Sequence, residues 1–314
     1  MSRILITGVA GFIGMHAAIR FLDEGWDVVG IDNINDYYDV QLKYDRLKEI
    51  GMRADLSNGD FRFHKADLNS SVWVQLKEEK FDACLHLAAQ AGVRYSLENP
   101  EAYIMSNILG FQKVLDFVKS AGIKRFLYAS SSSVYGSRTE QPFRESFNCS
   151  KPESYYAATK IANELMAFSY HRTNGIQSIG LRFFTVYGPW GRPDMAPMLF
   201  ASAAAKNKSI KVYNYGNQRR DFTYIDDIIQ GIYSLVILNK FPAGAEVFNI
   251  GNGSPVGLMD FISELEVNMK IELSKEFVEA QLGDVEETFA DTTKLFNLTG
   301  YKPRTSLETG IEKF

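Results

Sequence analysis

The chain has 314 residues, of which 46% are hydrophobic and 23% charged, a composition typical of a globular protein with a sizeable core. Its net charge of −4 and the lack of a basic run argue against a nucleic-acid partner. Two cysteines without a CxxC spacing argue against a disulfide framework and a structural zinc site, so we expect no bound metal.

The first residues lead directly into an apolar, strand-like segment at residues 4–6. A secretory signal would place a basic region and an apolar run ahead of the fold, and we expect none. No apolar stretch approaches the ~20 residues that span a bilayer. Together with the cysteine usage, this predicts a cytoplasmic protein without a membrane partner.

Short β-branched segments alternate with longer helical patterns over the first two thirds of the chain. Helical periodicity runs over 12–25 and 101–122, and each stretch closes on a glycine. Strands that alternate with helices predict right-handed βαβ crossovers and a Rossmann-type, doubly wound parallel sheet of the α/β class. The predicted strands are 3–7, 27–32, 61–65, 83–87, 125–130 and 178–183.

The pattern loosens after about residue 185, where Gly, Pro and aromatic residues become frequent. Short strands are expected at 211–215 and 246–251, interleaved with helices. We therefore predict a first domain over 1–185 and a smaller α/β lobe over 186–314. Segments of the second lobe are expected to cross back to the first domain.

A glycine-rich turn follows the first strand in 4-ILITGVAGFIG-14, with Gly8, Gly11 and Gly14 at three-residue spacing. Strand, glycine turn and helix follow in the order of a dinucleotide site, where backbone and helix N-terminus meet the pyrophosphate. Asp32 closes the next strand, 18 residues beyond Gly14, and no Arg or Lys follows it before Lys43. A carboxylate there favours NAD over NADP. The alternative for Asp32 is a solvated strand-end carboxylate.

Small residues end the fourth predicted strand in 86-HLAA. Ala88 and Ala89 would leave room for a ribose and nicotinamide, although small residues at a strand end also serve packing. His86 has no second histidine or acid at ligand spacing, so we interpret it as a core histidine.

A Y-x-x-x-K pattern lies in the helical segment 154–170. Tyr156 and Lys160 share one helix face, which places an ammonium one turn from the phenol. Tyrosine has a pKa of ~10, so a base near pH 7 needs that pKa lowered, and a neighbouring ammonium and a cationic nicotinamide both act in that direction. Tyr155 has Thr159 at i+4 and is expected to pack.

These features together resemble the extended short-chain dehydrogenase/reductase family, nucleotide-sugar epimerase branch. The resemblance covers nearly the whole chain through the segments GVAGFIG, HLAA, ASSSSVYG, YYAATK, RFFTVYGPWGRPDM and RRDFTYIDD. The UDP-glucuronate 4-epimerases are most similar, on 32-DNINDYYDVQLK-43, 91-AGVRYSLENP-100, the Phe-Thr of 183-FFTVYGPWGRPDMA-196 and 283-GDVEETFAD-291.

The resemblance implies NAD as cofactor and a catalytic set of Ser131, Tyr156 and Lys160, with Ser131 four residues before the Tyr of VYG. It implies phosphate binding by Arg220, uridine ribose binding by Asp284 and a sugar-pocket role for Arg94, whereas Arg219 is expected at the surface. Some related epimerases have an arginine where this chain has Gln281. The implied cofactor-binding residues are Gly8, Gly11, Phe12, Ile13, Gly14, Asp32, Asn33, Asn35, Asp67, Leu68, Leu87, Ala88, Ala89, Asn107, Ser130, Tyr156 and Lys160.

Ser132 and Ser133 stand where similar dehydratases carry Asp-Glu, and Ser133 where related decarboxylases carry glutamate. We hypothesise that Ser132, Ser133, Thr185 and Arg192 hold the carboxylate of a hexuronate. The alternative is that the serines fill space and that Arg192 pairs with Asp194.

The resemblance therefore implies NAD-dependent 4-epimerisation of UDP-glucuronate to UDP-galacturonate by a homodimer. Three alternatives remain open: a neutral UDP-hexose or UDP-N-acetylhexosamine as substrate, oxidative decarboxylation of UDP-glucuronate, and an NAD(H)-binding regulator. The last of these predicts loss of the Ser-Tyr-Lys set, which is present here.

Overall fold

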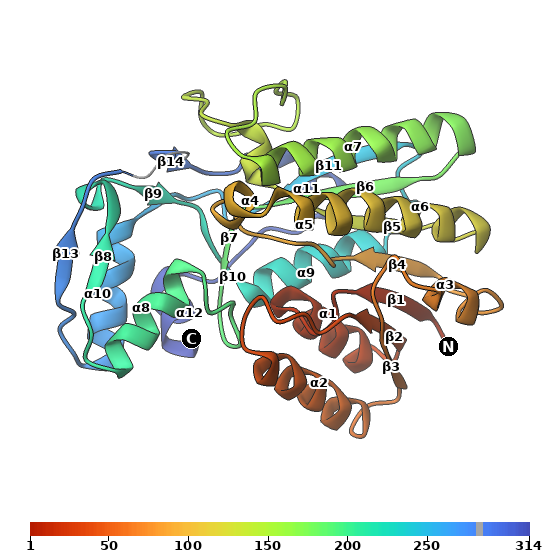
Figure 1. The fold of residues 1–314 in the computed structure, drawn as a ribbon, viewed down its shortest axis with the longest axis horizontal. Coiled ribbons are helices and arrows are strands. Elements are labelled where there is room, and N and C mark those ends of the chain that lie inside the picture. Colours follow the sequence, from red (N-terminus) through yellow and green to blue (C-terminus); the bar gives the residue numbers. More distant parts are fainter. Residues whose placement is uncertain (281–284) are drawn as a thin grey trace.

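A parallel sheet of seven strands forms the centre of the molecule in the computed structural model, which describes residues 1–280 and 285–314 (Figure 1). The strand order is β11-β6-β5-β4-β1-β2-β3, and every neighbouring pair is parallel. The strands are β1 (Arg3–Thr7), β2 (Asp27–Asp32), β3 (Phe61–Lys65), β4 (Ala83–His86), β5 (Phe126–Ser131), β6 (Ser178–Phe183) and β11 (Ala245–Ile250). The predicted α/β doubly wound sheet is confirmed; β4 ends one residue earlier than predicted, and β5 is shifted by one residue at both ends.

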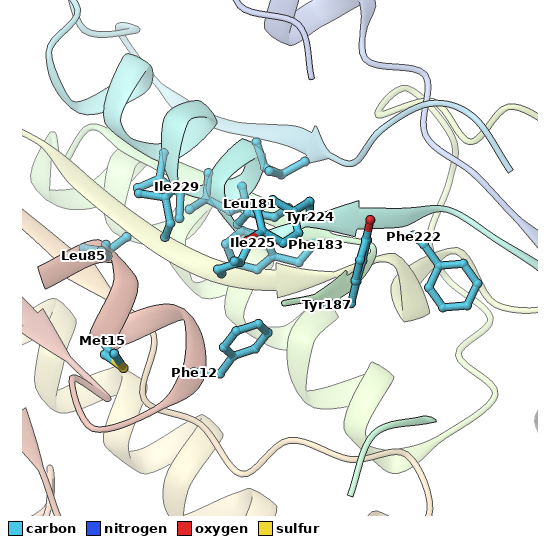
Figure 2. Packing of buried hydrophobic residues seen from close by; sticks show 14 of the residues in the cluster. Phe12, Met15, Leu85, Leu181, Phe183, Tyr187, Phe222, Tyr224, Ile225 and Ile229 are labelled. Carbon is cyan, nitrogen blue, oxygen red and sulfur yellow. The ribbon is translucent and has the colours of Figure 1, made fainter. Parts of the chain in front are cut away.

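Helices cover both faces of this sheet (Figure 1). One face carries α1 (Phe12–Asp23), α2 (Val40–Ala54) and α9 (Ile225–Val236), and the other carries α6 (Gly110–Ser120) and α7 (Tyr155–Asn174). Each face has its own apolar cluster, because successive strand residues point to opposite sides. In Figure 2, side chains of α1, β6 and α9 form one cluster with Tyr187 and Phe222 from β7 (Thr185–Tyr187) and β10 (Phe222–Tyr224).

The helical pattern predicted over 101–122 is interrupted in the structure. It consists of α5 (Pro100–Tyr103), a π-helical segment η1 (Ile104–Leu109) and α6. The predicted stops at Gly25 and Gly122 are confirmed, since both residues have a positive φ, of 75° and 67°. The π-helical segment lies beside α7, and Asn163 Nδ2 donates to the Asn107 carbonyl at 2.6 Å.

A smaller group of elements lies at the left of Figure 1 and is drawn mainly from residues after 185. The predicted strand at 211–215 is shorter than expected, because Asn214 and Tyr215 both have φ near 51° and form a 3-10 turn. The predicted strand at 246–251 is β11, which crosses back and pairs with β6. A domain boundary at residue 185 stays a prediction. The elements are β8 (Ile210–Val212), η3 (Tyr213–Gly216), β9 (Arg219–Arg220), β12 (Val256–Gly257), β13 (Lys275–Phe277), β14 (Glu287–Thr288), α8 (Ala196–Ala205), α10 (Leu258–Met269) and α12 (Leu307–Lys313).

Short elements complete the chain: α3 (Val72–Gln75), α4 (Tyr95–Glu98), the 3-10 turn η2 (Ser132–Tyr135) and α11 (Thr293–Thr299). Of the helices in the described ranges, none combines the length and apolarity needed to cross a bilayer.

A buried aspartate in the RRDFTYIDD segment organises the second group of elements. Asp221 accepts hydrogen bonds from Asn252 N (2.7 Å), Gly253 N (2.9 Å), Ala290 N (3.0 Å) and Thr223 Oγ1 (2.8 Å). A carboxylate with this many donors can stay buried without an ion-pair partner. It thereby ties β10 to the turn after β11 and to the segment before α11.

Candidate active site

A cavity of about 470 Å³ opens at the carboxyl ends of the parallel strands. Its size is in the range of small-molecule sites, and it is bordered by β1, β2, β4, β5 and β7. The predicted site residues that line it are Gly8, Gly11, Phe12, Ile13, Gly14, Asp32, Asn33, Asn35, Asp67, Leu68, Leu87, Ala88, Ala89, Ser130, Ser131, Ser132, Ser133, Tyr156, Lys160, Thr185, Arg192 and Arg220.

The glycine turn approaches its surroundings too closely for side chains. Gly8 has φ 73°, and a Cβ there would lie 2.6 Å from Ala88 N. A Cβ on Gly14 would lie 2.1 Å from the Gly8 carbonyl oxygen. Gly11 precedes α1 without a side-chain cap, so the first N–H groups of the helix have no capping side chain. The turn therefore has the shape and the backbone donors of a pyrophosphate cradle.

Asp32 lies at the far end of this turn. Its Oδ2 accepts from Ala10 N at 3.1 Å and its Oδ1 from Ile34 N at 2.9 Å. Burial raises the pKa of Asp32, while the Ile34 N–H and the cation of Lys43 oppose that rise. The carboxylate is thus held by backbone N–H groups at the edge of the cavity, where Asp32 is half-buried.

Lys43 is a cavity residue that the motif analysis missed. Its Nζ donates to the carbonyl and side-chain oxygens of Asn35, both at 2.6 Å. Asn33 Nδ2 donates to Asp67 Oδ2 at 3.0 Å, which joins the ends of β2 and β3. The helical spacing after the YYD segment was the available signal for Lys43, since it places this residue one turn inside α2.

His86 is buried, as predicted for a core histidine. It shares a 2.7 Å hydrogen bond with Thr7 Oγ1, and burial lowers the pKa of His86 to about 3. The Thr7 hydroxyl also accepts from Ala88 N at 3.3 Å. This pair holds the small-residue turn after β4 against β1.

Tyr156 and Lys160 reach the cavity from the first turns of α7, which Ser154 caps by accepting from Ala157 N at 3.1 Å. Lys160 Nζ donates to the Ala129 carbonyl at 2.8 Å and lies 5.9 Å from the centre of the Tyr156 ring. Burial lowers the pKa of Lys160 to about 8, and the charge of Glu164 opposes this.

The expected lowering of the Tyr156 pKa is not found in the protein alone. Burial raises the pKa of Tyr156, while a hydrogen bond with Ser131 and the charge of Arg192 act in the opposite direction. The Lys160 ammonium lies near the same ring while it donates to the Ala129 carbonyl. The predicted contribution of the Lys160 charge to the phenolate stays a prediction.

The four consecutive serines differ in their surroundings. Ser130, at 2% exposure, donates its hydroxyl to Glu164 Oε1 at 2.6 Å. Ser131 ends β5 and caps the following 3-10 turn, accepting from Ser133 N at 3.2 Å and from the Ser133 hydroxyl at 2.9 Å. The strand end thus presents three hydroxyls, those of residues 131–133, to the cavity.

A buried ion pair below the serines was not predicted. Arg182 of β6 binds Glu164 of α7 through two parallel hydrogen bonds, Nε to Oε1 at 2.9 Å and Nη2 to Oε2 at 2.7 Å. Their side chains are only 5% and 12% exposed. Glu164 follows Tyr156 and Lys160 at further four-residue steps, so the three share one face of α7. That spacing was the signal available in the sequence.

Arg192 lines the cavity and also pairs with Asp194, as the alternative predicted. Its Nε donates to Oδ1 at 3.1 Å and its Nη2 to Oδ2 at 2.5 Å, and Nη2 also donates to the Ala91 carbonyl at 2.9 Å. Tyr37, another residue that was missed, donates its hydroxyl to Asp194 Oδ2 at 3.2 Å. Burial lowers the pKa of Arg192, but Asp194 outweighs burial and raises it overall.

Two predicted residues do not line the cavity. Arg94 is exposed at the start of α4, with its guanidinium carbon 5.1 Å from the centre of the Tyr213 ring. Asn107 is buried in the π-helical segment, where Nδ2 donates to the Gln90 carbonyl and to Thr159 Oγ1, both at 3.0 Å. Its bonds to protein groups assign Asn107 a structural role in place of the predicted cofactor contact.

The remaining predicted residues divide by position. Arg220 lines the cavity and donates from Nη1 to the Glu286 carbonyl at 3.0 Å. Arg219 is exposed and pairs with Glu287 at 3.2 Å, as predicted for a surface residue. Tyr155 is 38% exposed, so its predicted packing is wrong for this chain. Asp284 and Gln281 lie outside the described residues.

Residues 4–251 match the NAD dependent epimerase/dehydratase family. The chain belongs to this family. Among its relatives, the protein CapI of Staphylococcus aureus is 47% identical over 99% of this chain and 97% of its own length. A probable UDP-glucuronate 4-epimerase of Rhizobium meliloti is 42% identical over 99% of this chain and 95% of its own length.

Solved structures of this epimerase/dehydratase family include a UDP-glucuronic acid 4-epimerase from Bacillus cereus, in complex with UDP-glucuronic acid and NAD. It superposes with a TM-score of 0.90 at 34% identity and covers 99% of this chain and 97% of its own. The similarity therefore extends over the whole fold.

Proposed function

We propose that this protein is an NAD-dependent UDP-glucuronate 4-epimerase, which interconverts UDP-glucuronate and UDP-galacturonate through a 4-keto intermediate. One observation carries the proposal: Ser131, Tyr156 and Lys160 meet in one cavity with hydroxyls, not acids, at positions 132 and 133. Family membership and relatives of this activity support it.

The residues of the cavity fit NAD. Gly8 and Gly14 leave a cradle that a Cβ would fill, and the start of α1 has no side-chain cap. Asp32 provides the acceptor for ribose hydroxyls. When bound, NAD+ supplies a reversible acceptor for the hydride on C4 of the sugar.

Tyr156 acts as the base that takes the proton of the C4 hydroxyl, with Ser131 relaying or orienting it. The phenol must lose its proton against a raised pKa, so the Ser131 hydrogen bond and nearby positive charge are needed for the reaction. After C4 is oxidised, the keto sugar presents its other face; the hydride returns to C4 on that face, and Tyr156 returns the proton to the C4 oxygen. Arg220 retains the diphosphate during this turnover.

The substrate carboxylate sets a second requirement. A 4-keto uronate is a β-keto acid, which loses CO2 when its carboxylate stands perpendicular to the carbonyl plane. Ser132, Ser133, Thr185 and Arg192 all line the cavity and can hold the carboxylate away from that alignment. Ser132 and Ser133 carry no carboxylate, so a base for elimination is lacking at these two positions.

A product analysis tests the proposed function. The purified protein is incubated with UDP-glucuronate and NAD+, and the products are followed by NMR, with UDP-glucose and UDP-N-acetylglucosamine in parallel. UDP-galacturonate without CO2 is expected. A UDP-pentose as the main product, or turnover of the neutral sugars alone, contradicts the proposal.

We also propose that the protein is a cytoplasmic homodimer that pairs through α7 and the π-helical segment. Both cysteines are free thiols, which suits a reducing compartment. Large apolar side chains are exposed on the two neighbouring elements, including Leu165 (65%) and Phe168 (55%) on α7 and Leu109 (43%) on η1. Sedimentation of the wild type against Leu165→Glu tests this pairing, and a monomeric wild type would exclude it.

A further inference from the structure

Arg46 is a fully buried arginine of α2 that belongs to neither the cofactor nor the substrate residues described above. Its Nη1 donates to the Ala10 carbonyl at 3.1 Å and to the Tyr38 hydroxyl at 2.7 Å. Its Nη2 donates to the carbonyls of Trp190 at 2.7 Å and Gly191 at 3.2 Å. One guanidinium thus bonds to the glycine turn and to a loop 144 residues away.

A second donor reaches the same loop from the same domain. His16, on α1, donates from Nε2 to the Pro189 carbonyl at 3.0 Å. Three successive carbonyls, at residues 189–191, are therefore bonded by side chains of α1 and α2. In Figure 1 this loop, between β7 and α8, passes beside these two helices. We call Arg46 and His16 the loop clamp.

The clamped loop is strained and carries a site residue. Trp190 has φ 63°, a conformation that costs free energy for a bulky residue and persists only when surrounding contacts impose it. Arg192 follows two residues later and lines the cavity. Arg46 forms no ion pair with a carboxylate among residues 1–280 and 285–314. Burying a cation that bonds mainly to carbonyls is costly, and stability alone does not explain it.

We propose that Arg46 is a positioning residue that sets where Arg192 stands in the cavity, with His16 as its helper. Because Arg46 also holds Ala10 of the glycine turn, it joins the pyrophosphate cradle to the sugar-binding loop through one side chain. The position of Arg192 then depends on the cofactor domain as well as on its own partner, Asp194. This inference rests on the proposed function, in which Arg192 holds the substrate carboxylate.

The test compares a uronate with a neutral nucleotide sugar on the NAD-loaded protein. Arg46→Met removes the donors, Arg46→Lys keeps the charge with fewer of them, and Arg53→Met is the matched control, exposed on the same helix. In Arg46→Met, binding of UDP-glucuronate measured by calorimetry is expected to weaken about tenfold, the scale of a lost hydrogen bond to a charged group, with UDP-glucose within about twofold. Arg46→Lys should recover part of the difference.

The ratio of the products gives a second readout, which would not change if Arg46 had a merely structural role. With UDP-glucuronate, Arg46→Met is expected to raise KM more than it lowers kcat and to increase the fraction of UDP-pentose. Equal weakening for both sugars, or no change for either, overturns the proposal. If the wild type does not epimerise UDP-glucuronate, the proposed function fails while the binding comparison still tests the clamp.

His16→Phe carries the test if the Arg46 variants do not fold. It keeps an aromatic ring and removes one donor to the loop, so the same selective loss is expected at a smaller size. An unchanged ratio of uronate to neutral-sugar affinity in His16→Phe would then overturn the proposal.

Discussion

The cofactor end and the sugar end of the cavity are lined by different kinds of groups. At the cofactor end, backbone makes much of the surface: the glycines of the turn have no side chains, and Asp32 is oriented by the N–H groups of Ala10 and Ile34. At the sugar end, the surface consists of side-chain groups that hold one another, such as the hydroxyls of Ser131 and Ser133 and the pair of Arg192 with Asp194.

This difference determines how each end can fail. A backbone cradle is intolerant of one added carbon atom, because the atoms it would meet cannot move away. A side-chain network tolerates small changes in shape, and losing one member redirects the others. We therefore expect cofactor-end substitutions to act on NAD binding and sugar-end substitutions to act on rate and product.

The largest effect is expected at the reacting atoms. Tyr156→Phe removes the base and keeps the ring, so kcat should fall by about three orders of magnitude while NAD and UDP-glucuronate still bind. Steady-state kinetics and calorimetry on one preparation check both parts. Near-normal turnover in this variant would mean that another group is the base.

Glu164→Gln should cost the most stability. It leaves the buried Arg182 without its counter-charge, and a loss of about 3 kcal/mol in the free energy of unfolding is expected. Glu246→Gln breaks a partly exposed pair with Lys294 and should cost less than about 1 kcal/mol. Urea titrations of the two variants measure the difference, and equal midpoints would contradict it.

The same variant should shift the pH dependence of the reaction. Burial lowers the pKa of Lys160 to about 8, and the charge of Glu164 partly offsets this lowering. Without that charge the pKa falls, and Lys160 becomes neutral at lower pH. Since its cationic form favours the phenolate, the alkaline limb of the kcat/KM profile should move to lower pH. A shift to higher pH would contradict the assignment.

Gly14→Ala should disrupt the cofactor end of the cavity and leave the sugar end intact. The new Cβ would lie 2.1 Å from the Gly8 carbonyl oxygen, so the turn must open and NAD affinity should fall by about two orders of magnitude. Gly51→Ala on α2 is the control, because a Cβ there meets no atom within 4 Å. Fluorescence titration with NADH compares them, and equal affinities would show that the turn can adapt.

Ser133→Ala should have the smallest effect on rate and the clearest effect on product. Removing its hydroxyl loosens Ser131 and the proposed carboxylate contact, so kcat/KM should fall less than about tenfold while the share of UDP-pentose rises. Ser120→Ala, which removes an exposed hydroxyl on α6, should change neither. An unchanged product ratio in Ser133→Ala would remove this serine from the carboxylate site.

Local sequence determined most of the cofactor end and the catalytic helix. Glycine spacing, strand ends and the four-residue step from Tyr156 to Lys160 depend only on residues close together in the sequence. They can therefore be recognised from a few consecutive residues. The parallel direction of the strands follows from the same alternation, because a helix between two strands returns the chain to the same edge of the sheet.

Only the tertiary structure decided which polar side chains form their hydrogen bonds and contacts within the protein. Asn107 and Arg94 have suitable chemistry for a site, but Gln90 and Tyr213, brought close by folding, engage them. Arg46 and Glu164 have no motif of their own, and their partners lie in distant segments. Hydrogen bonding and burial depend on three-dimensional neighbours, so the sequence by itself determined the chemistry available to this protein, and folding decided where that chemistry is used.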